Sequence, residues 1–131
     1  MVKLSSYKLL PKLKEKYINE FYEAIFESSD LEDLKGFGNH LFTPTEIEAF
    51  AKRIAILKRL RTGLSYWEIK DEVKVTNATI TKMANILQKA NQKFVETFDD
   101  LIKEENKQER RKKDKLYVKG SKQLYAKRLS K

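Results

Sequence analysis

Hydrophobic side chains recur at helical spacing from near the start of the chain. Between about Lys12 and Ser28 they fall on one face while three glutamates fall on another, which predicts an amphipathic helix. We interpret the apolar face as core. Its many aromatic rings also indicate packing against a second subunit. The members of this face are Tyr17, Ile18, Phe21, Tyr22 and Ile25.

A short second helix is predicted over Leu31 to Lys35. Ser29-Asp30 supplies a side-chain cap, and Gly36-Phe37-Gly38 is expected to end the helix. His40 is then expected in a loop. As the only histidine of the sequence, it lacks partners for catalysis or metal binding.

The strongest helix start in the sequence is Thr43-Pro44-Thr45-Glu46. Thr43 is the predicted N-cap, Pro44 takes the first helical position, and Glu46 completes a capping box. Apolar residues then recur until Thr62-Gly63 ends the helix. We expect this to be the central core helix, buried through Ile47, Phe50, Ile54, Leu57 and Leu60.

Residues 65–88 have the layout of a helix-turn-helix. Ser65 and Glu68 form a second capping box, Lys74-Val75 forms the turn, and Thr76 caps the second helix. The predicted inward positions are Ile69, Val73, Val75, Ile80, Leu87 and one of Met83 or Ala84.

The opposite face of the second helix carries Asn77, Ala78, Thr81 and Lys82. A basic helix-turn-helix places this helix in the major groove, where its first turns contact base edges. Small side chains allow close approach, and asparagine or lysine directs hydrogen bonds to bases. The pattern predicts a DNA-reading helix.

Positive charge is concentrated on this motif and on the C-terminal end. The 131-residue chain has a net charge of +9; residues 52–93 contain 10 basic and 3 acidic side chains, and residues 106–131 contain 11 and 2. Residues 1–51 and 94–105 are net acidic. Such concentration indicates a phosphate-facing surface. The candidate cations around the motif are Lys52, Arg53, Lys58, Arg59, Arg61 and Lys74.

The chain is predicted to divide at about residue 103. Residues 1–103 are predicted to form a helical dimerisation and DNA-binding domain, because so small a core gains from burial between protomers. Residues 104–131 are a basic extension, partly helical or disordered. Its cations are either solvated or a second nucleic-acid contact, with Arg110, Arg111, Lys112 and Lys113 as candidates.

Several functional classes lack their sequence signals. Without cysteine, a Gly-rich phosphate loop or a ligand cluster, we expect no enzyme, no cofactor and no metal site. The adjacent pairs Asp99-Asp100 and Glu104-Glu105 do not converge on one helix face, so they are expected either to shape the electrostatics of the dimer or to pair with basic neighbours. No apolar run reaches the roughly 18 residues of a membrane span, which predicts a cytoplasmic protein without a membrane partner.

Several motifs between about Glu20 and Lys89 carry a family resemblance. They are Phe42-Thr43-Pro44-Thr45-Glu46, Ala49, Arg53, Gly63, Glu68, Lys70 and, most specifically, Ala78-Thr79-Ile80-Thr81. This set resembles the Trp repressor superfamily, in particular its YerC/YecD-type members. The resemblance implies an all-α fold of about six helices, an intertwined homodimer and a palindromic operator in double-stranded DNA. It places against DNA the residues Tyr66, Trp67, Lys70, Asn77, Ala78, Thr79, Thr81 and Lys82.

Lys70 and Lys74 depart from ordinary helix-turn-helix sequences, which prefer alanine and glycine at these positions. A positive φ at Lys74 would cost on the order of 1 kcal/mol. Trp67 either lies against the DNA backbone or covers the core.

The resemblance also predicts that the corepressor site is lost. Of the two arginines that hold tryptophan in the family, one corresponds to Arg53 and the other is replaced by Lys82. The glycine that leaves room for the indole is Met83, and a ligand-binding serine is Ile86. Because methionine fills that space and isoleucine removes a hydrogen-bonding group, we expect no tryptophan response, and another effector is left open.

The predicted function is a sequence-specific, dimeric DNA-binding transcriptional regulator, acting as a repressor. Two recognition helices about 34 Å apart would read half-sites one helical turn apart. One alternative is a non-specific or architectural nucleic-acid binder that depends on the basic tail. The other is a protein-interaction adaptor on a helix-turn-helix scaffold.

Overall fold

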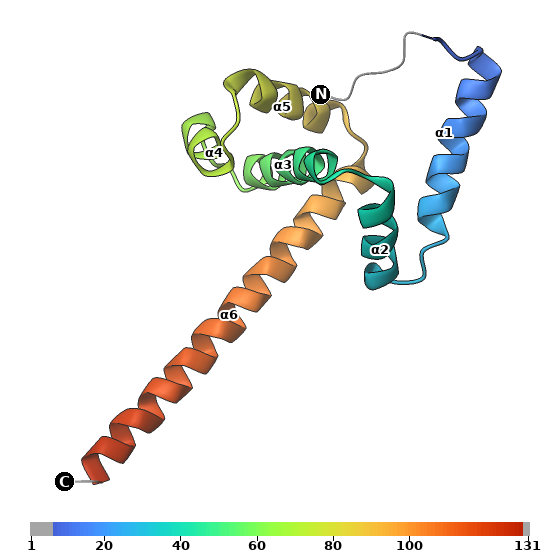
Figure 1. The fold of residues 1–131 in the computed structure, drawn as a ribbon. Coiled ribbons are helices and arrows are strands. Elements are labelled where there is room, and N and C mark those ends of the chain that lie inside the picture. Colours follow the sequence, from blue (N-terminus) through green and yellow to red (C-terminus); the bar gives the residue numbers. More distant parts are fainter. Residues whose placement is uncertain (1–6, 130–131) are drawn as a thin grey trace. The chain divides into compact units, whose positions relative to one another are not determined.

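The computed structural model describes the backbone of residues 7–129 and the side chains of residues 7–116. In this range the chain forms six helices and no strand, which confirms the all-α prediction (Figure 1). The chain divides into two compact units, Met1–Lys52 and Arg53–Lys131, called here the N-terminal and C-terminal units. The helices are α1 (Pro11–Phe26), α2 (Leu31–Leu41), α3 (Pro44–Arg61), α4 (Tyr66–Val73), α5 (Asn77–Lys89) and α6 (Gln92–Leu129).

Side-chain caps fix the starts of α2 and α3. The Asp30 carboxylate accepts a hydrogen bond from the Asp33 N–H at 2.8 Å. At α3 the bonds are reciprocal: Thr43 Oγ1 accepts from the Glu46 N–H at 3.2 Å, and Glu46 Oε1 accepts from the Thr43 N–H at 2.9 Å. These bonds hold the pKa of Glu46 below its ordinary value. The predicted capping box of α3 is confirmed.

The prediction for α2 is wrong at its C-terminal end. The helix continues through Gly36 and Gly38 to Leu41, and the extended backbone of Phe42 ends it. Among the described glycines only Gly63, after α3, has a positive φ. A glycine in helical conformation costs about 1 kcal/mol, which weakens a capped helix without ending it. His40 therefore lies in the last turn of α2 and not in a loop.

The apolar face of α1 does not form a core within this chain, contrary to the prediction. No side chain of α1 is buried, and Tyr17, Ile18 and Tyr22 are exposed. Aromatic rings meet edge-on in this unit: Phe42 contacts Phe21 at a centroid distance of 6.1 Å and Phe50 at 5.9 Å. The described residues of the N-terminal unit contain no fully buried hydrophobic side chain, because its helices are too few to cover one another.

The burial of α3 also differs from the prediction. Of the five expected core positions only Leu57 is buried, with Leu60 packed against the core, while Ile47 and Ile54 are exposed. Ile56 is fully buried instead. Burial is confined to the C-terminal half of α3, the part that belongs to the C-terminal unit.

The core of the C-terminal unit takes side chains from four helices. They are Ile56 and Leu57 from α3, Ile69 and Val73 from α4, Ile80 and Met83 from α5, and Phe98 from α6. Met83 rather than Ala84 fills the inward position on α5, since Met83 is 2% exposed. Val75 and Leu87 pack at the edge of this core. The inward face predicted for the helix-turn-helix is thereby confirmed.

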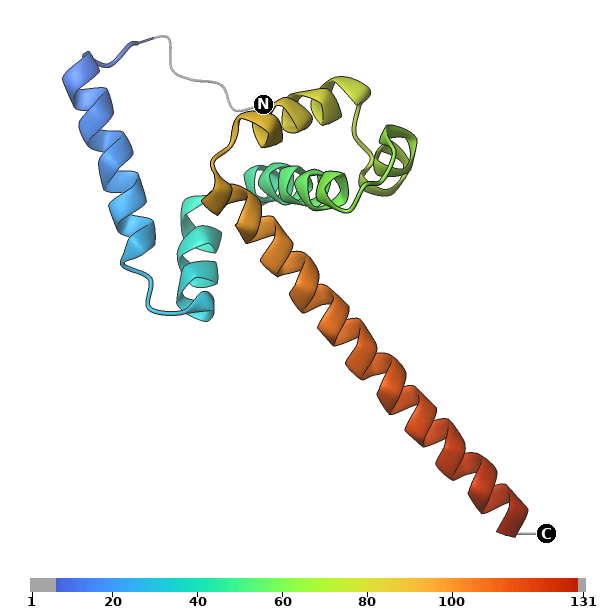
Figure 2. The ribbon, with the colours of Figure 1, turned by 180° about the vertical axis from the view of Figure 1, so that it is seen from behind.

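Helix α6 is a single 38-residue helix that crosses residue 104 without a break. Its first turns lie beside α3 in both views (Figures 1 and 2). The Arg61 guanidinium donates two hydrogen bonds to the Asp99 carboxylate, each at 2.9 Å, and Lys58 pairs with Glu105. These cations lower the pKa of both carboxyl groups. The expected pairing of the acidic residues with basic neighbours is confirmed for Asp99 and Glu105.

None of the helices over residues 7–129 combines the length and apolar character that a transmembrane segment needs.

Candidate nucleic-acid interface

Two side-chain caps define the helix-turn-helix. Ser65 Oγ accepts from the Glu68 N–H at 3.2 Å, and Glu68 Oε2 accepts from the Ser65 N–H at 3.0 Å. At the start of α5, Thr76 Oγ1 accepts from the Thr79 N–H at 3.3 Å. Both predicted starts are confirmed. Each cap satisfies N–H groups that the first turn of a helix leaves without a backbone partner.

Lys74 makes the turn between α4 and α5. Its backbone is left-handed, with φ 61° and ψ 57°, and no other non-glycine residue in the described range has a positive φ. The Lys74 N–H donates to the Lys70 carbonyl at 3.0 Å and ends α4. A lysine in this conformation costs on the order of 1 kcal/mol. The sharp turn that glycine would favour is therefore present with a modest strain.

The core contacts of α4 and α5 determine which faces of the motif remain in solvent. On α5, Ile80 and Met83 are buried, and Asn77, Ala78, Thr81 and Lys82 are exposed. All four were predicted from the sequence to face DNA. Within the described part of the chain, the side chains of Asn77, Thr81 and Lys82 form no hydrogen bond or ion pair, so their polar groups are available to a ligand.

Helix α4 contributes an exposed aromatic and basic surface beside α5. Ile69 and Val73 point into the core, whereas Tyr66, Trp67 and Lys70 are exposed. Trp67 is 75% exposed, so it does not cover the core of this chain. Of its two predicted roles, contact with the DNA backbone fits this exposed position, and coverage of the core does not.

Thr79 differs from the other predicted DNA-facing residues. It is half-buried, and its hydroxyl lies 3.1 Å from that of Thr76. The Thr79 N–H is also the donor to the Thr76 cap. The side chain is therefore engaged in fixing the start of α5.

Five of the predicted phosphate-contacting cations form ion pairs, three of them at short distance. Arg59 Nε lies 2.7 Å from the Glu72 carboxylate, and a second Arg59 nitrogen donates to the Ala55 carbonyl at 3.1 Å. With the pairs of Lys58 and Arg61, these bonds tie α3 to α4 and α6. Lys52 and Lys74 make looser pairs at 4.0 and 3.8 Å, and Arg53 is exposed. On α6, all four predicted cations from Arg110 to Lys113 are exposed.

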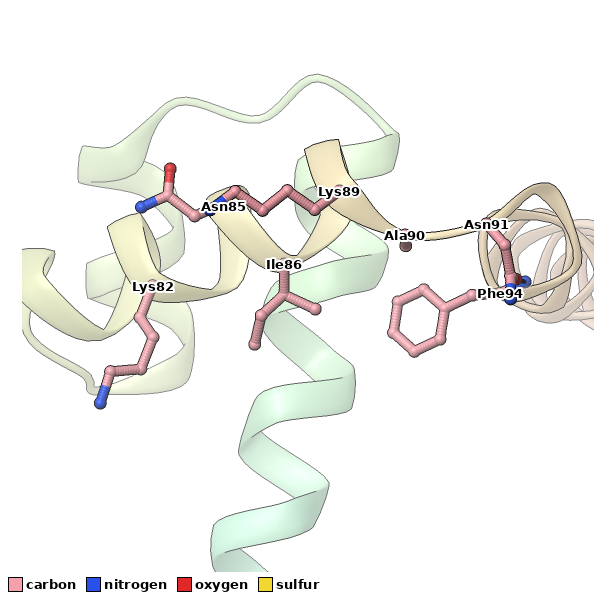
Figure 3. A pocket seen from close by; sticks show the side chains of 7 residues that line it. All are labelled: Lys82, Asn85, Ile86, Lys89, Ala90, Asn91 and Phe94. Carbon is pink, nitrogen blue, oxygen red and sulfur yellow. Dashed lines mark hydrogen bonds between the residues drawn. The ribbon is translucent and has the colours of Figure 1, made fainter.

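The residues of the predicted former corepressor pocket differ in their surroundings. Met83 is in the core, Arg53 is exposed on α3, and Lys82 and Ile86 lie beside an open hollow (Figure 3). Ile86, Lys82 and the Phe94 ring extend to the same side of α5 in this view. The hollow is lined by Lys82, Asn85, Ile86, Lys89, Ala90, Asn91 and Phe94.

The junction between α5 and α6 is the part of this surface that sequence reasoning missed. Asn91 Oδ1 accepts from the Phe94 N–H at 2.9 Å and caps α6. The Phe94 ring then packs edge-on against Phe98 at 5.0 Å. An asparagine immediately before an amphipathic run is the signal that predicts such a cap.

The fold and this exposed surface define an all-α helix-turn-helix protein. The family model described as Trp repressor protein matches residues 16–105. The chain is 29% identical over 90 residues to the uncharacterised protein YerC of Bacillus subtilis (strain 168), which covers 69% of this chain and 86% of that protein. It also matches the crystal structure of a candidate Trp repressor from Staphylococcus aureus. That match has a TM-score of 0.60 and 25% identity, and covers 72% of this chain and 95% of the other.

The chain therefore belongs to the Trp repressor family, whose members are helix-turn-helix DNA-binding regulators. This confirms the resemblance seen in the sequence. Residues 106–131 lie beyond the segment that the family model matches.

Proposed function

We propose that the protein is a sequence-specific transcriptional regulator that reads a palindromic operator and acts as a repressor. The observation that carries this proposal is the outward face of α5. Asn77, Ala78, Thr81 and Lys82 are exposed on a capped helix that Ile80 and Met83 anchor in the core. A rigid helix with free polar groups in its first turns is what base readout in the major groove requires.

The chemistry of these side chains fits base edges. Asparagine can bond adenine through two atoms, lysine can bond guanine O6 and N7, and an alanine or threonine methyl can contact the methyl group of thymine. Each good pair discriminates against the wrong base by about 1–3 kcal/mol. Ala78 also lets the helix approach the groove closely because its side chain is small.

We propose that α4 contacts the sugar-phosphate backbone of the DNA. In a helix-turn-helix the first helix crosses the phosphates while the second enters the groove. Tyr66 and Trp67 present apolar rings to sugars, and Lys70 presents an ammonium group to a phosphate. Lys58, Arg59 and Arg61 would have to leave their carboxylate partners to do the same. Their proposed contribution is therefore to position α4 and α6 rather than to hold DNA.

The exposed apolar surface of the N-terminal unit supports a homodimer. Tyr17, Tyr22 and Phe26 on α1 are exposed, as are Ile47 and Phe50 at the start of α3. An apolar surface of this extent is typically buried against another subunit. A dimer with two recognition helices about 34 Å apart would match half-sites one helical turn apart. Light scattering at micromolar concentration should give the mass of two chains, and the mass of one chain would contradict the dimer.

Competition binding against random genomic fragments tests sequence specificity. A regulator of this kind should bind its operator about 10³-fold or more tightly than bulk DNA. Salt-sensitive binding without sequence preference would instead support an architectural binder. An absence of DNA binding would support the adaptor function.

We also propose that DNA binding does not depend on tryptophan. The Met83 side chain is 2% exposed and belongs to the core, and Ile86 offers no hydrogen bond. Calorimetry of the purified protein with L-tryptophan should show no saturable heat. Saturable binding at micromolar concentration would contradict this prediction.

A further inference from the structure

We infer that the distal part of α6, residues 106–129, is a second DNA-binding surface that contacts duplex phosphates without reading sequence. We call this segment the basic arm. It contains 10 basic and 2 acidic residues, and the helix is continuous to Leu129. The inference goes beyond the proposed function, because it needs neither an operator nor base contacts from α5.

The first observation is that the arm's cations are free up to residue 115, where the described side chains with a positive charge end. All six between residues 107 and 115 are exposed, and none has a carboxylate partner within the described part of the chain. Those on α3 are different, since Lys58, Arg59 and Arg61 are each paired. A row of exposed cations without internal partners attracts a polyanion.

The second observation is how the arm is attached. Asp99 and Glu105, in the first half of α6, are paired with Arg61 and Lys58 of α3. These pairs occupy acidic side chains that would otherwise offset the positive charge of the arm. The arm is the continuation of this same helix. It therefore extends from the compact unit that also contains α4 and α5.

The third observation is that the arm is about as long as one turn of duplex DNA and lies outside the segment matched by the family model. At 1.5 Å per residue the arm is about 36 Å long, close to one turn of B-DNA at about 34 Å. The family model matches residues 16–105, so the arm lies outside the matched segment.

The distribution of charge favours DNA over a lipid surface. A helix that lies on a membrane needs one apolar face. Residues 106–115 contain no apolar side chain, and successive positions 100° apart place cations on all sides of the helix. Residues 106–115 are therefore basic on all sides of the helix, which suits the phosphates of a duplex.

The test is the salt dependence of binding to a random-sequence duplex, measured with the full-length protein. The variant combines Arg110→Gln, Arg111→Gln, Lys112→Gln and Lys113→Gln, which keeps good helix formers in place. If all four contact phosphates, the slope of log K against log salt should flatten by about 0.9 per lost contact. Between 50 and 200 mM salt, the variant should then lose on the order of 100-fold less affinity than the parent.

A charge-matched control replaces Lys8, Lys12, Lys14 and Lys16 with glutamine in the N-terminal unit. This control should keep a steeper slope than the arm variant, which separates a local contact from a change in net charge. Glu109→Gln with Asp114→Asn should strengthen non-specific binding, because it removes the two carboxylates of the arm. Circular dichroism checks that each variant is still helical.

An unchanged slope in the arm variant would overturn the inference, as would equal flattening in the control. Binding of the arm to anionic phosphatidylserine vesicles with an unchanged DNA slope would also overturn it. The proposed function can fail separately. If the parent protein shows no sequence preference but its salt slope still depends on the arm, sequence-specific regulation is contradicted and DNA binding by the arm is supported.

Discussion

Replacing Phe98 with alanine is expected to lower the free energy of unfolding by about 3–5 kcal/mol. Phe98 is 2% exposed and brings α6 into the core formed by α3, α4 and α5. The substitution removes the transfer free energy of the ring and leaves a cavity that a packed core fills only in part. It also removes the edge-on contact with Phe94. Denaturant unfolding at a fixed protein concentration measures the change.

Leu116→Ala is the matched control, because Leu116 lies on the same helix and is 70% exposed. It should change the free energy of unfolding by no more than about 0.5 kcal/mol, the usual range for surface substitutions. If Phe98→Ala cost no more than this control, the assignment of α6 to the core would be wrong.

Replacing Lys82 with alanine is expected to relax sequence preference at one position of each half-site. Lys82 lies on the exposed face of α5, next in sequence to Thr81, and forms no ion pair in the described part of the chain. If its ammonium group bonds a base, its loss should reduce discrimination there by about 1–3 kcal/mol and leave other positions unchanged. Binding to a set of single-base operator variants measures this directly.

Lys89→Ala supplies the comparison. Lys89 is exposed in the last turn of the same helix, away from the end that enters the groove. Its loss should weaken binding to all sequences by a similar, small factor. Uniform weakening by Lys82→Ala as well would reassign Lys82 to a phosphate contact.

The starts of α3, α4 and α5 could be predicted from the sequence because the signals for a helix start are local. The capping boxes at Thr43 and Ser65 and the cap at Thr76 each involve residues three apart, and all three are present. The turn at Lys74 could also be predicted, because Lys74 lies between two helices with recognisable caps. Short-range hydrogen bonds depend little on the rest of the fold.

Helix ends and burial were less predictable, because they depend on what surrounds each element. Gly36 and Gly38 are helix-weakening residues, yet α2 continues past both. The apolar spacing of α1 predicted a helix correctly, but it could not show whether this chain or a second one covers Tyr17 and Tyr22. Periodicity identifies an apolar face without identifying its partner.

The ion pairs that attach α6 to α3 could not be predicted from the sequence, for a different reason. Arg61 and Asp99 are 38 positions apart, and Lys58 and Glu105 are 47 apart. Among many charged residues, composition predicts that such pairs form but not which ones. The continuity of α6 through the basic arm was also open, because the same composition fits a helix or a disordered tail.

Selection of bound duplexes from a random-sequence pool tests the central claim most directly. A dimer reading DNA through α5 should enrich a palindrome whose half-sites are centred about 10 base pairs apart, one turn of the double helix. The same pool offered to a protein carrying Asn77→Ala, Thr81→Ala and Lys82→Ala should lose the palindrome, while salt-sensitive binding through the basic arm persists. Enrichment of no motif by the parent protein, or of the same motif by the triple variant, would contradict readout by α5.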